Sequence, residues 1–432
     1  MRAAALVRLI AAAVAASGGC GAPAAAQQAL SVKLQHVVIV VQENRSFDNL
    51  FQGYPGADTV ASGKDSHGDT IPLRAIPLEA PYGIRHDSAD FFAACNGTGS
   101  IPGTNCAMDG FDLESYAREA HTPKFLPYAY VPHRETKLYF QMAHRYVVAD
   151  RMFTSNIDAS FTSHQYIIAA QAHSAVDLPG LPWGCPAGPY DLVTTLLQNR
   201  TYGPAERPCF NYRTIGDELD ARGLPWRFYA DSGPGYLWLA YQAVRHIRNS
   251  PDWPRHAKTP AQRFLRDVAR GELDAVTWVT PTCPNSDHAG CGGNTGPAWV
   301  ASVVNAVGES KFWPTTAIFV MWDEWGGWYD HVPPPYEDYD GLGIRVPLLV
   351  ISPYAKRDYV SHVQYEHGSI LRFVEDLFGL HRLAASDARA NSPAADCFDF
   401  AGPPRPFVPF AIHLGDWRNV RPPAPLSATD LD

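Results

Sequence analysis

Two pairs of polar residues follow apolar runs in this sequence, and their side chains are suited to bind a cation. Glu43 and Asn44 follow a run of valine and isoleucine, and Asp323 and Glu324 directly follow the run Thr316 to Trp322. Carboxylate and amide oxygens are ligands that hard divalent cations prefer. Adjacent acids at the end of an apolar strand are costly to bury unless they are solvated or bind a cation. We therefore predict a metal site here. The alternative is that Glu43 is a solvated loop residue and Asn44 caps the next helix.

A second candidate for chemistry is a cluster of hydroxyl residues before an apolar helical segment at Tyr166 to Ala172. Ser160, Thr162 and Ser163 lie in this cluster. A serine at the start of a helix is usually a cap, because its oxygen accepts from free backbone N–H groups. The same N–H groups and the helix dipole favour a bound phosphate, so a hydroxyl there could attack phosphorus. Spacing alone does not choose among the three.

Two histidines are further candidates. His288 lies in the short segment between Cys283 and Cys291, where a disulfide would hold it at the end of an apolar run. His86, in a stretch rich in glycine, proline and aspartate, is a candidate substrate contact. A histidine in such a loop can equally be solvated.

The elements that must position these residues are apolar strands. Val37 to Val41 is unbroken and β-branched throughout, which is typical of a strand covered on both faces in a parallel sheet. Further strands are expected at Trp226 to Tyr229, Ala275 to Pro281, Thr316 to Trp322 and Leu348 to Ser352. Open α/β sheets bind ligands at the carboxyl ends of their strands. The fold class we predict is α/β.

Helices are expected around Leu138 to Val148, at Thr214 to Ala221 and over residues 365 to 379, where an amphipathic pattern ends at a glycine. Residues 52 to 135 contain few periodic apolar runs, which indicates irregular excursions over the sheet. The chain beyond Leu380 is expected to be an irregular, Pro-rich tail.

The first 26 residues have the pattern of a signal peptide, with two arginines, an alanine-rich apolar segment and small residues before Gln27. Lipoprotein anchoring at Cys20 is a minor alternative. Residues 27 to 432 are predicted to form a single domain, since no linker, repeat or low-complexity segment divides them. Without residues 1 to 26, 33 basic and 44 acidic residues remain. This excess of acids argues against a nucleic-acid partner.

Six cysteines fall into three close pairs, and Cys397 is left over. The pairs are Cys95 with Cys106, Cys185 with Cys209, and Cys283 with Cys291. In an exported protein, such pairs indicate disulfides that hold long loops. A structural zinc site is the alternative, but the sequence has no Cys-x-x-Cys spacing.

Three motifs, taken together, resemble the phosphoesterase family of bacterial non-haemolytic phospholipases C and secreted acid phosphatases, to which plant non-specific phospholipases C also belong. The motifs are Gln-Glu-Asn-Arg-Ser-Phe-Asp from Gln42, Asp-Glu-Trp-Gly-Gly-Trp-Tyr-Asp-His-Val-Pro-Pro-Pro from Asp323, and Gly-Ile-Arg-Val-Pro-Leu-Leu-Val-Ile-Ser-Pro from Gly343. They lie in the family's order and span residues 36 to 380. The resemblance implies an alkaline-phosphatase-like fold, with a mostly parallel sheet flanked by helices and long loops.

The resemblance also implies roles for individual residues. Its serine-containing motif points to Ser160 as the nucleophile, although Thr162 and Ser163 stand where proline and asparagine are common. The implied ligands of one divalent metal ion, with Ca, Mg or Mn favoured, are Glu43, Asn44, Ser160, Asp323 and Glu324. His288 is implied in catalysis and His86 in substrate binding. His331 is a further candidate for substrate binding, although it could instead be structural.

The function that we expect is that of a secreted or periplasmic, metal-dependent phosphoesterase of the phospholipase C type, acting on phospholipids. A broad-specificity acid phosphatase that cleaves soluble phosphate esters is the alternative. A non-catalytic secreted binding protein is a third reading, which predicts losses among the metal ligands, and the sequence shows none. Transient contact with a membrane surface is expected, and no obligate protein partner is evident.

Overall fold

The computed structural model describes residues 30–116, 122–231, 238–291 and 293–412. The predicted signal peptide, including Cys20, lies outside the described residues. Within them, no helix is both long enough and apolar enough to cross a membrane.

An eight-stranded sheet forms the centre of the fold. Among its described strands, only β13 runs antiparallel to its neighbours. The prediction of an α/β fold with a mostly parallel sheet is confirmed. In spatial order the strands are β10 (Ala257–Lys258), β9 (Trp226–Tyr229), β11 (Val276–Val279), β1 (His36–Gln42), β12 (Thr316–Trp322), β13 (Leu348–Ile351), β6 (Val147–Ala149) and β14 (Tyr359–Ser361).

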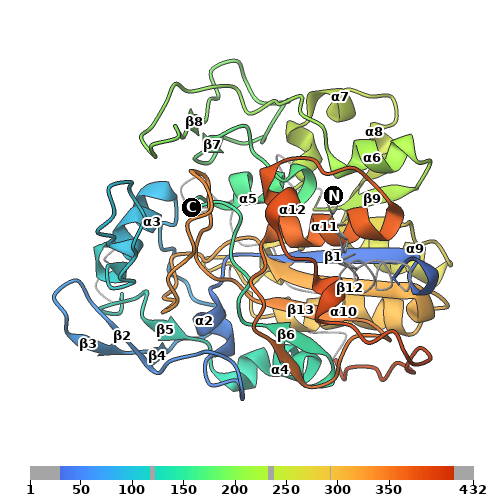
Figure 1. Cartoon of the computed structure of the whole chain (residues 1–432), viewed down its shortest axis with the longest axis horizontal. Coiled ribbons are helices and arrows are strands. Elements are labelled where there is room, and N and C mark those ends of the chain that lie inside the picture. Colours follow the sequence, from blue (N-terminus) through green and yellow to red (C-terminus); the bar gives the residue numbers. More distant parts are fainter. Residues whose placement is uncertain (1–29, 117–121, 232–237, 292, 413–432) are drawn as a thin grey trace, which may run out of the picture.

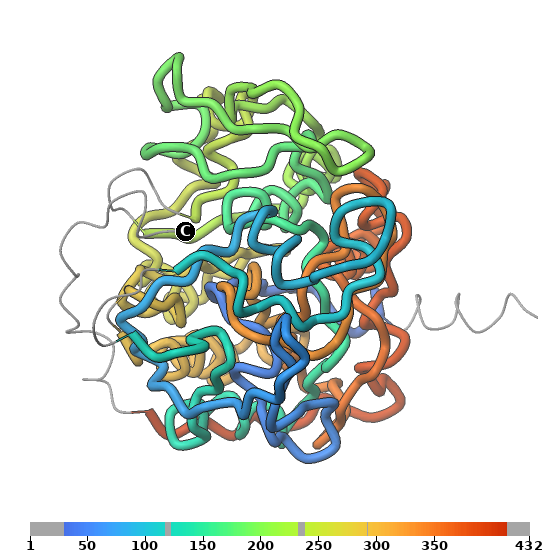
Figure 2. Tube along the Cα trace, turned by 90° about the vertical axis from the view of Figure 1, so that its left-hand side faces the viewer, coloured from blue at the N-terminus to red at the C-terminus, as the bar shows by residue number. Residues whose placement is uncertain are grey.

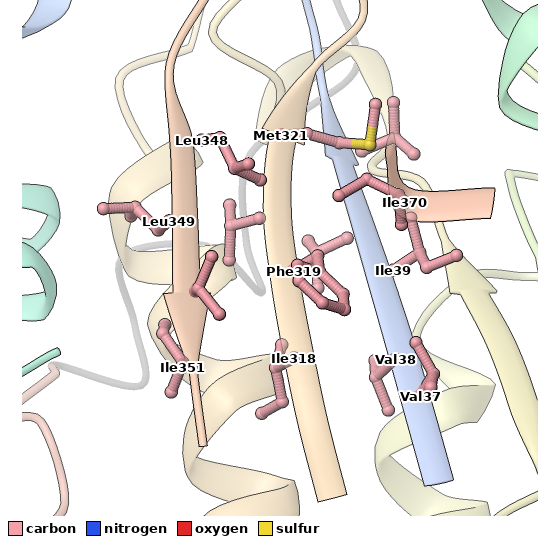
Figure 3. Close-up of a cluster of buried hydrophobic side chains, with 14 of the residues drawn as sticks. Val37, Val38, Ile39, Ile318, Phe319, Met321, Leu348, Leu349, Ile351 and Ile370 are labelled. Atoms are coloured by element: carbon pink, nitrogen blue, oxygen red, sulfur yellow. The ribbon is translucent and has the colours of Figure 1, made fainter. Parts of the chain in front are cut away.

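The central strands are buried on both faces, as their continuous apolar sequences require. Every residue of β12 is buried, and so is every residue of β1 after His36. Figure 3 shows side chains of β1, β12 and β13 packed together, with Ile370 reaching them from α11 (His367–Phe378). The rings of Phe319 and Phe373, from β12 and α11, lie 4.8 Å apart. Burial of these side chains holds the helical layer against the sheet.

Helices cover both faces of the sheet (Figure 1). One layer contains α5 and α11, which pack against each other, and the opposite layer contains α4 and α10, which also pack together. The remaining helices are shorter and lie around these layers. The described helices are α2 (Phe47–Phe51), α3 (Ser88–Cys95), α4 (His133–Arg145), α5 (Ser160–Ala169), α6 (Ile215–Ala221), α7 (Arg245–Arg248), α8 (Trp253–His256), α9 (Arg263–Ala269), α10 (Gly296–Gly308), α11 (His367–Phe378) and α12 (Ala385–Arg389).

Long excursions connect these elements and lie together on one side of the molecule, which Figure 2 shows as the blue, cyan and green parts of the trace. They contain three small two-stranded sheets. These are β2 (Ser62–Lys64) with β3 (Thr70–Pro72), β4 (Arg74–Ala75) with β5 (Ala129–Tyr130), and β7 (Ala175–Val176) with β8 (Thr194–Thr195).

The three predicted disulfides are confirmed in the described residues. Cys95 bonds to Cys106, Cys185 to Cys209 and Cys283 to Cys291. The alternative of a zinc site is wrong for these six cysteines. Cys397 is a buried free thiol.

Several predicted boundaries are wrong. The helix expected around Leu138 to Val148 is α4, which begins at His133 and ends at Arg145, so that Val147 starts β6. The helix expected at Tyr166 to Ala172 is α5, which begins six residues earlier. It ends at Ala169 because Ala170 adopts a left-handed conformation, with φ of 56°. The segment beyond Leu380 contains α12, and it places Phe398 and Phe410 against the main core.

Candidate active site

The ends of β1 and β12 bring the two predicted pairs of ligands together. Gln42 is paired with Trp322 in the sheet, so the next residues, Glu43 and Asp323, leave neighbouring strands side by side. The backbone N–H of Asp323 donates to the carbonyl of Gln42 at 3.0 Å. The backbone N–H of Asn44 donates to Asp323 Oδ1, also at 3.0 Å. Parallel pairing therefore places the four predicted ligand residues at one edge of the sheet.

The chain turns sharply after both strands, which keeps these side chains inside the protein. Asn44 has φ of 52°, and Gly326, with φ of 66°, lies against its carbonyl oxygen. A Cβ atom at Gly326 would stand 2.3 Å from that oxygen, so a side chain does not fit there. The N–H of Gly326 donates to Glu324 Oε2 at 2.6 Å. This glycine therefore allows the two turns to pack against each other.

Ser160 is the first residue of α5, and its hydroxyl faces this cluster. Its Oγ donates to Asn44 Oδ1 at 3.4 Å, and the residue is 1% exposed. The other two candidate hydroxyls have partners elsewhere. Thr162 donates to the carbonyl of Ala175 at 3.0 Å, and Ser163 accepts from the Asn156 amide at 3.0 Å. Of the three hydroxyls, the structure thus places that of Ser160 beside the predicted metal ligands.

His164, which sequence reasoning missed, also enters this cluster. Its Nε2 lies 3.0 Å from Glu43 Oε1 and 3.7 Å from Asp323 Oδ2. Residues four apart on a helix lie on the same face, so the spacing from Ser160 to His164 was a usable signal. Using it required the correct start of α5.

His86 contacts the ligand cluster from the long loop before α3. Its Nδ1–H donates to the carbonyl of Ile84 at 2.7 Å, and its Nε2 accepts from the Asn44 amide at 2.9 Å. The same Nε2 lies 3.3 Å from Glu324 Oε1. Burial, and then the nearby His288, lower the pKa of His86 to about 4. The ring is therefore neutral at neutral pH.

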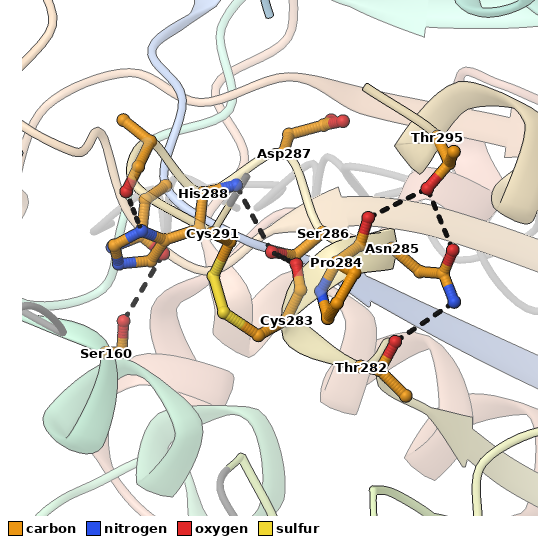
Figure 4. Close-up of a disulfide and its surroundings, with 12 residues drawn as sticks. Ser160, Thr282, Cys283, Pro284, Asn285, Ser286, Asp287, His288, Cys291 and Thr295 are labelled. Carbon is orange, nitrogen blue, oxygen red and sulfur yellow. Dashed lines mark hydrogen bonds between the residues drawn. A yellow bond between two sulfur atoms is a disulfide. The ribbon is translucent and has the colours of Figure 1, made fainter. Parts of the chain in front are cut away.

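His288 is held in the loop that the Cys283–Cys291 disulfide closes, which Figure 4 shows together with Ser160. The ring Nδ1–H donates to the carbonyl of Ala289 at 2.5 Å. The loop is also attached to β1, because the N–H of Asp287 donates to Gln42 Oε1 at 3.0 Å. The rings of His288 and His86 lie 6.1 Å apart, so both predicted histidines reach the same region.

The carboxylates at the centre of this cluster fit a cation. Single ligand atoms of Glu43, His164 and Asp323 all lie within 4.8 Å of one another. Glu43 Oε2 and Asp323 Oδ2 are buried and have no hydrogen-bond partner. Burial, together with Asp323 and Glu324, raises the pKa of Glu43 well above its usual range. A bound cation would offset the cost of keeping these acids ionised.

A comparison with family models matches residues 34–381 to the Phosphoesterase family. This chain belongs to that family. It is a phosphoric ester hydrolase, and the predicted family and enzyme class are confirmed. The matched range includes every predicted site residue of this phosphoesterase.

Curated relatives of the phosphoesterase are phospholipases C. A non-hemolytic phospholipase C of Pseudomonas aeruginosa is 26% identical over 427 residues, which cover 86% of this chain and 58% of that protein. Phospholipase C B of Mycobacterium tuberculosis is 25% identical, with 88% of this chain and 80% of that protein covered. Non-specific phospholipase C1 of Arabidopsis thaliana is 26% identical, with 84% and 73% covered. The chain thus spans less than two thirds of the Pseudomonas relative.

Solved structures with a similar arrangement are more distant in sequence. A protein in the alkaline phosphatase superfamily from Vibrio parahaemolyticus is 9% identical, with a TM-score of 0.38, covering 84% of this chain and 72% of that chain. A putative sulfatase from Bacteroides thetaiotaomicron is 11% identical, with a TM-score of 0.37, covering 60% and 68%.

His331 of the phosphoesterase belongs to a different buried cluster. Its Nδ1 lies 2.6 Å from Asp48 Oδ2, and its Nε2 lies 3.0 Å from Asp58 Oδ1. Arg345, which is fully buried, donates from Nε to Asp330 Oδ1 at 2.9 Å and lies 3.4 Å from Asp48 Oδ1. Both ring nitrogens of His331 are thus engaged by carboxylates. This arrangement is what the structural alternative for His331 requires, and both that alternative and its role in substrate binding stay predictions.

Proposed function

We propose that this phosphoesterase is a metal-dependent hydrolase that cleaves phospholipids in the manner of a phospholipase C, with Ser160 as its nucleophile. The observation that carries the proposal is the position of the Ser160 hydroxyl, at the start of α5 and beside Asn44, Glu43 and Asp323. The phospholipase C relatives support the choice of a phosphodiester substrate.

Ser160 lies where a phosphoryl group can be bound and attacked. The first backbone N–H groups of α5 have no acceptors within the helix and favour an anion at this end. Ser160 Oγ would form a bond to phosphorus while the bond from phosphorus to the leaving alkoxide breaks. The oxygen of a water molecule would then bond to phosphorus as the bond to Oγ breaks. His288, which protonated the alkoxide in the first step, would take one proton from this water, and Oγ would regain from solvent the proton it lost before attack.

One divalent ion is part of this proposal, held by Glu43, Asn44, Ser160, Asp323 and Glu324. When bound, it would lower the pKa of the serine hydroxyl and neutralise charge on the phosphoryl oxygens. Glu43 Oε2 and Asp323 Oδ2, which are buried and have no hydrogen-bond partner, support such an ion. The all-oxygen set favours Ca, Mg or Mn.

The two histidines are suited to different tasks. His288, fixed by its disulfide loop, would donate a proton to the leaving alkoxide. His86 is neutral and accepts from the Asn44 amide through Nε2, so it would keep Asn44 in position. To contact a phosphoryl oxygen, Nε2 would have to exchange this partner and carry a proton. Both assignments follow from their positions around the Ser160 cluster.

An exposed apolar surface supports lipid as the substrate and a transient contact with a membrane. In the excursion that follows α5, large apolar side chains point to solvent, and Tyr190 is 93% exposed. The excursion is anchored near the site, because Trp183 packs on Phe161 with ring centroids 5.5 Å apart. Exposed tyrosine and leucine side chains are suited to the interface of a bilayer. The surface residues are Leu181, Tyr190, Leu192, Leu197 and Tyr202.

The location that we propose is outside the cytoplasm, either secreted or periplasmic. Three disulfides in the described residues support it, since such bonds persist in oxidising compartments. We also propose that residues 1–26 are a signal peptide and that residues 27–432 form a single domain.

A phosphomonoesterase is the second candidate function. Ser160 and His288 are 1% and 4% exposed, and such a closed site also suits a small soluble ester. The chemistry at phosphorus would be the same for both substrates.

The experiment that tests the function compares two substrates with one enzyme preparation. Release of phosphocholine from phosphatidylcholine vesicles is measured beside hydrolysis of a soluble aryl phosphate monoester. We expect faster turnover of the lipid, and Ser160→Ala should abolish both activities. Ser163→Ala, which changes a neighbouring hydroxyl of α5, is the control and should keep most activity. Turnover of the monoester alone would favour the second candidate.

A further inference from the structure

We propose that His164 is a positioning residue for the metal site, which holds one oxygen of Glu43 so that the other faces the ion. The inference rests on the metal-dependent function proposed above and adds a residue to it. His164 belongs neither to the predicted ligands nor to the predicted substrate contacts.

The carboxylates of Glu43 and Asp323 are held in the same way, each through one oxygen. His164 Nε2 lies 3.0 Å from Glu43 Oε1, which is a normal hydrogen-bond distance. Asp323 Oδ1 accepts from the backbone N–H of Asn44 at 3.0 Å. The second oxygens, Glu43 Oε2 and Asp323 Oδ2, have no hydrogen-bond partner. Each carboxylate is thus held through one oxygen and offers the other.

Burial makes this contact important for the direction of the Glu43 side chain. Glu43 and His164 are both fully buried, so water does not replace a lost hydrogen bond. Asp323 follows the neighbouring strand, and its carboxylate lies within 4.8 Å of that of Glu43, so Glu43 also faces another acid. In the tautomer with the proton on Nε2, the imidazole donates to Glu43 Oε1 and so fixes which oxygen turns toward the cation. Partners of metal ligands commonly fix ligand orientation in this way.

The position of His164 on α5 couples the metal site to the nucleophile. Ser160 begins the helix and His164 lies one turn later, so a single rigid element carries both groups. Trp183 packs near the imidazole, with ring centroids 6.4 Å apart. A shift of α5 would therefore move the attacking hydroxyl and the support of Glu43 together.

The test compares His164→Gln with His164→Asn. The glutamine amide nitrogen can reach the place of Nε2, whereas the asparagine amide is one methylene shorter, so the pair differs in reach alone. Affinity for Mn²⁺ is measured by titration calorimetry on chelator-treated protein. We expect His164→Gln to stay within about threefold of wild type and His164→Asn to bind about 10- to 100-fold more weakly. Thr162→Val, which removes another hydrogen bond of α5, is the matched control and should keep wild-type affinity.

Several results would overturn the inference. Equal Mn²⁺ affinity of His164→Asn and wild type would show that Glu43 does not need this support. A ¹⁴N coupling in the electron spin resonance of Mn²⁺ bound to wild type, lost in His164→Gln, would make His164 a ligand instead. Thermal unfolding of the metal-free variants checks that they fold, and His164→Met replaces His164→Asn if the latter does not. Absence of stoichiometric metal in active wild type would instead overturn the proposed metal dependence.

Discussion

At the scale of single residues, this phosphoesterase contains two buried clusters of acids whose negative charge is compensated in different ways. In one cluster, the guanidinium of Arg345 binds Asp330 and approaches Asp48, and His331 binds Asp48. In the other, Glu43 and Asp323 follow β1 and β12 and lie beside His164, and Glu43 Oε2 and Asp323 Oδ2 have no hydrogen-bond partner. Buried acids need a compensating charge. In the first cluster, the guanidinium of Arg345 supplies this charge. In the second, a bound metal ion would supply it.

His331 should make stability depend on pH. Burial pulls the pKa of His331 down, but the hydrogen bond and charge of Asp48, with Asp330, outweigh it and raise the pKa above its usual value. A raised histidine pKa stabilises the fold fully below about 6.5, and the stabilisation is lost as pH rises through the folded pKa. His331→Gln should therefore destabilise the protein more at pH 6 than at pH 9. Urea unfolding of both proteins at each pH measures the difference, and an equal loss at both pH values would contradict the account.

The positions of Glu43 and Asp323 could be predicted from the sequence because both lie at the ends of long apolar runs. Asp323 directly follows Thr316 to Trp322, and Glu43 follows Val37 to Val41 after one further residue, Gln42. His164 could not be found in this way. The helix was expected to begin at Tyr166, which placed His164 in a turn with no defined face. Its role depends on contacts with two strands that are distant in sequence.

At the scale of elements, the site is assembled by two parallel strands, one helix start and one disulfide loop. Seven elements were predicted close to their observed positions, because their apolar patterns are long or clearly periodic. They are β1, β9, β11, β12, β13, α6 and α11. The strands β6, β10 and β14 were missed, since each has only two or three residues. Such short strands are specified by their partners in the sheet, and local sequence carries little signal for them.

Removal of the Cys283–Cys291 disulfide should lower kcat strongly and lower the stability of the fold only modestly. The bond closes a short loop, for which chain entropy gives a stabilisation of about 2 to 3 kcal/mol. Replacement of both cysteines by serine should free His288 and lower kcat at least tenfold. The same replacement at Cys95 and Cys106 is the control, because its loop has similar length but holds no predicted catalytic residue. Thermal unfolding and kcat are measured on both. Equal losses of kcat would show that the loop does not position a catalytic group.

At the scale of the whole molecule, the long excursions turn a common sheet architecture into a closed site. They lie together on one side (Figure 2). The buried His288 lies beside His86 and Trp238 from two of them, with ring centroids 6.1 and 6.5 Å away. The same excursions hold exposed apolar residues, so the part of the chain that covers the site also carries the surface suited to lipid.

Replacement of Tyr190 and Leu192 by serine should lower activity on lipid vesicles. Both side chains are exposed, so their removal should leave the fold unchanged. We expect at least a fivefold loss of phosphocholine release, with hydrolysis of a soluble monoester unchanged. Val408→Ser changes an exposed apolar residue outside this excursion and is the matched control. Equal activity of the double variant on vesicles would show that this surface does not contact lipid.

The most direct test of the central claim is to trap the phosphorylated enzyme. Protein mixed with substrate is quenched in acid within one turnover and digested, and the peptide containing Ser160 is analysed by mass spectrometry. We predict one phosphocholine group on Ser160 when the substrate is phosphatidylcholine, one phosphoryl group when it is an aryl phosphate monoester, and neither in Ser160→Ala. Phosphorylation of Thr162, Ser163 or a histidine instead, or full activity of Ser160→Ala, would contradict it.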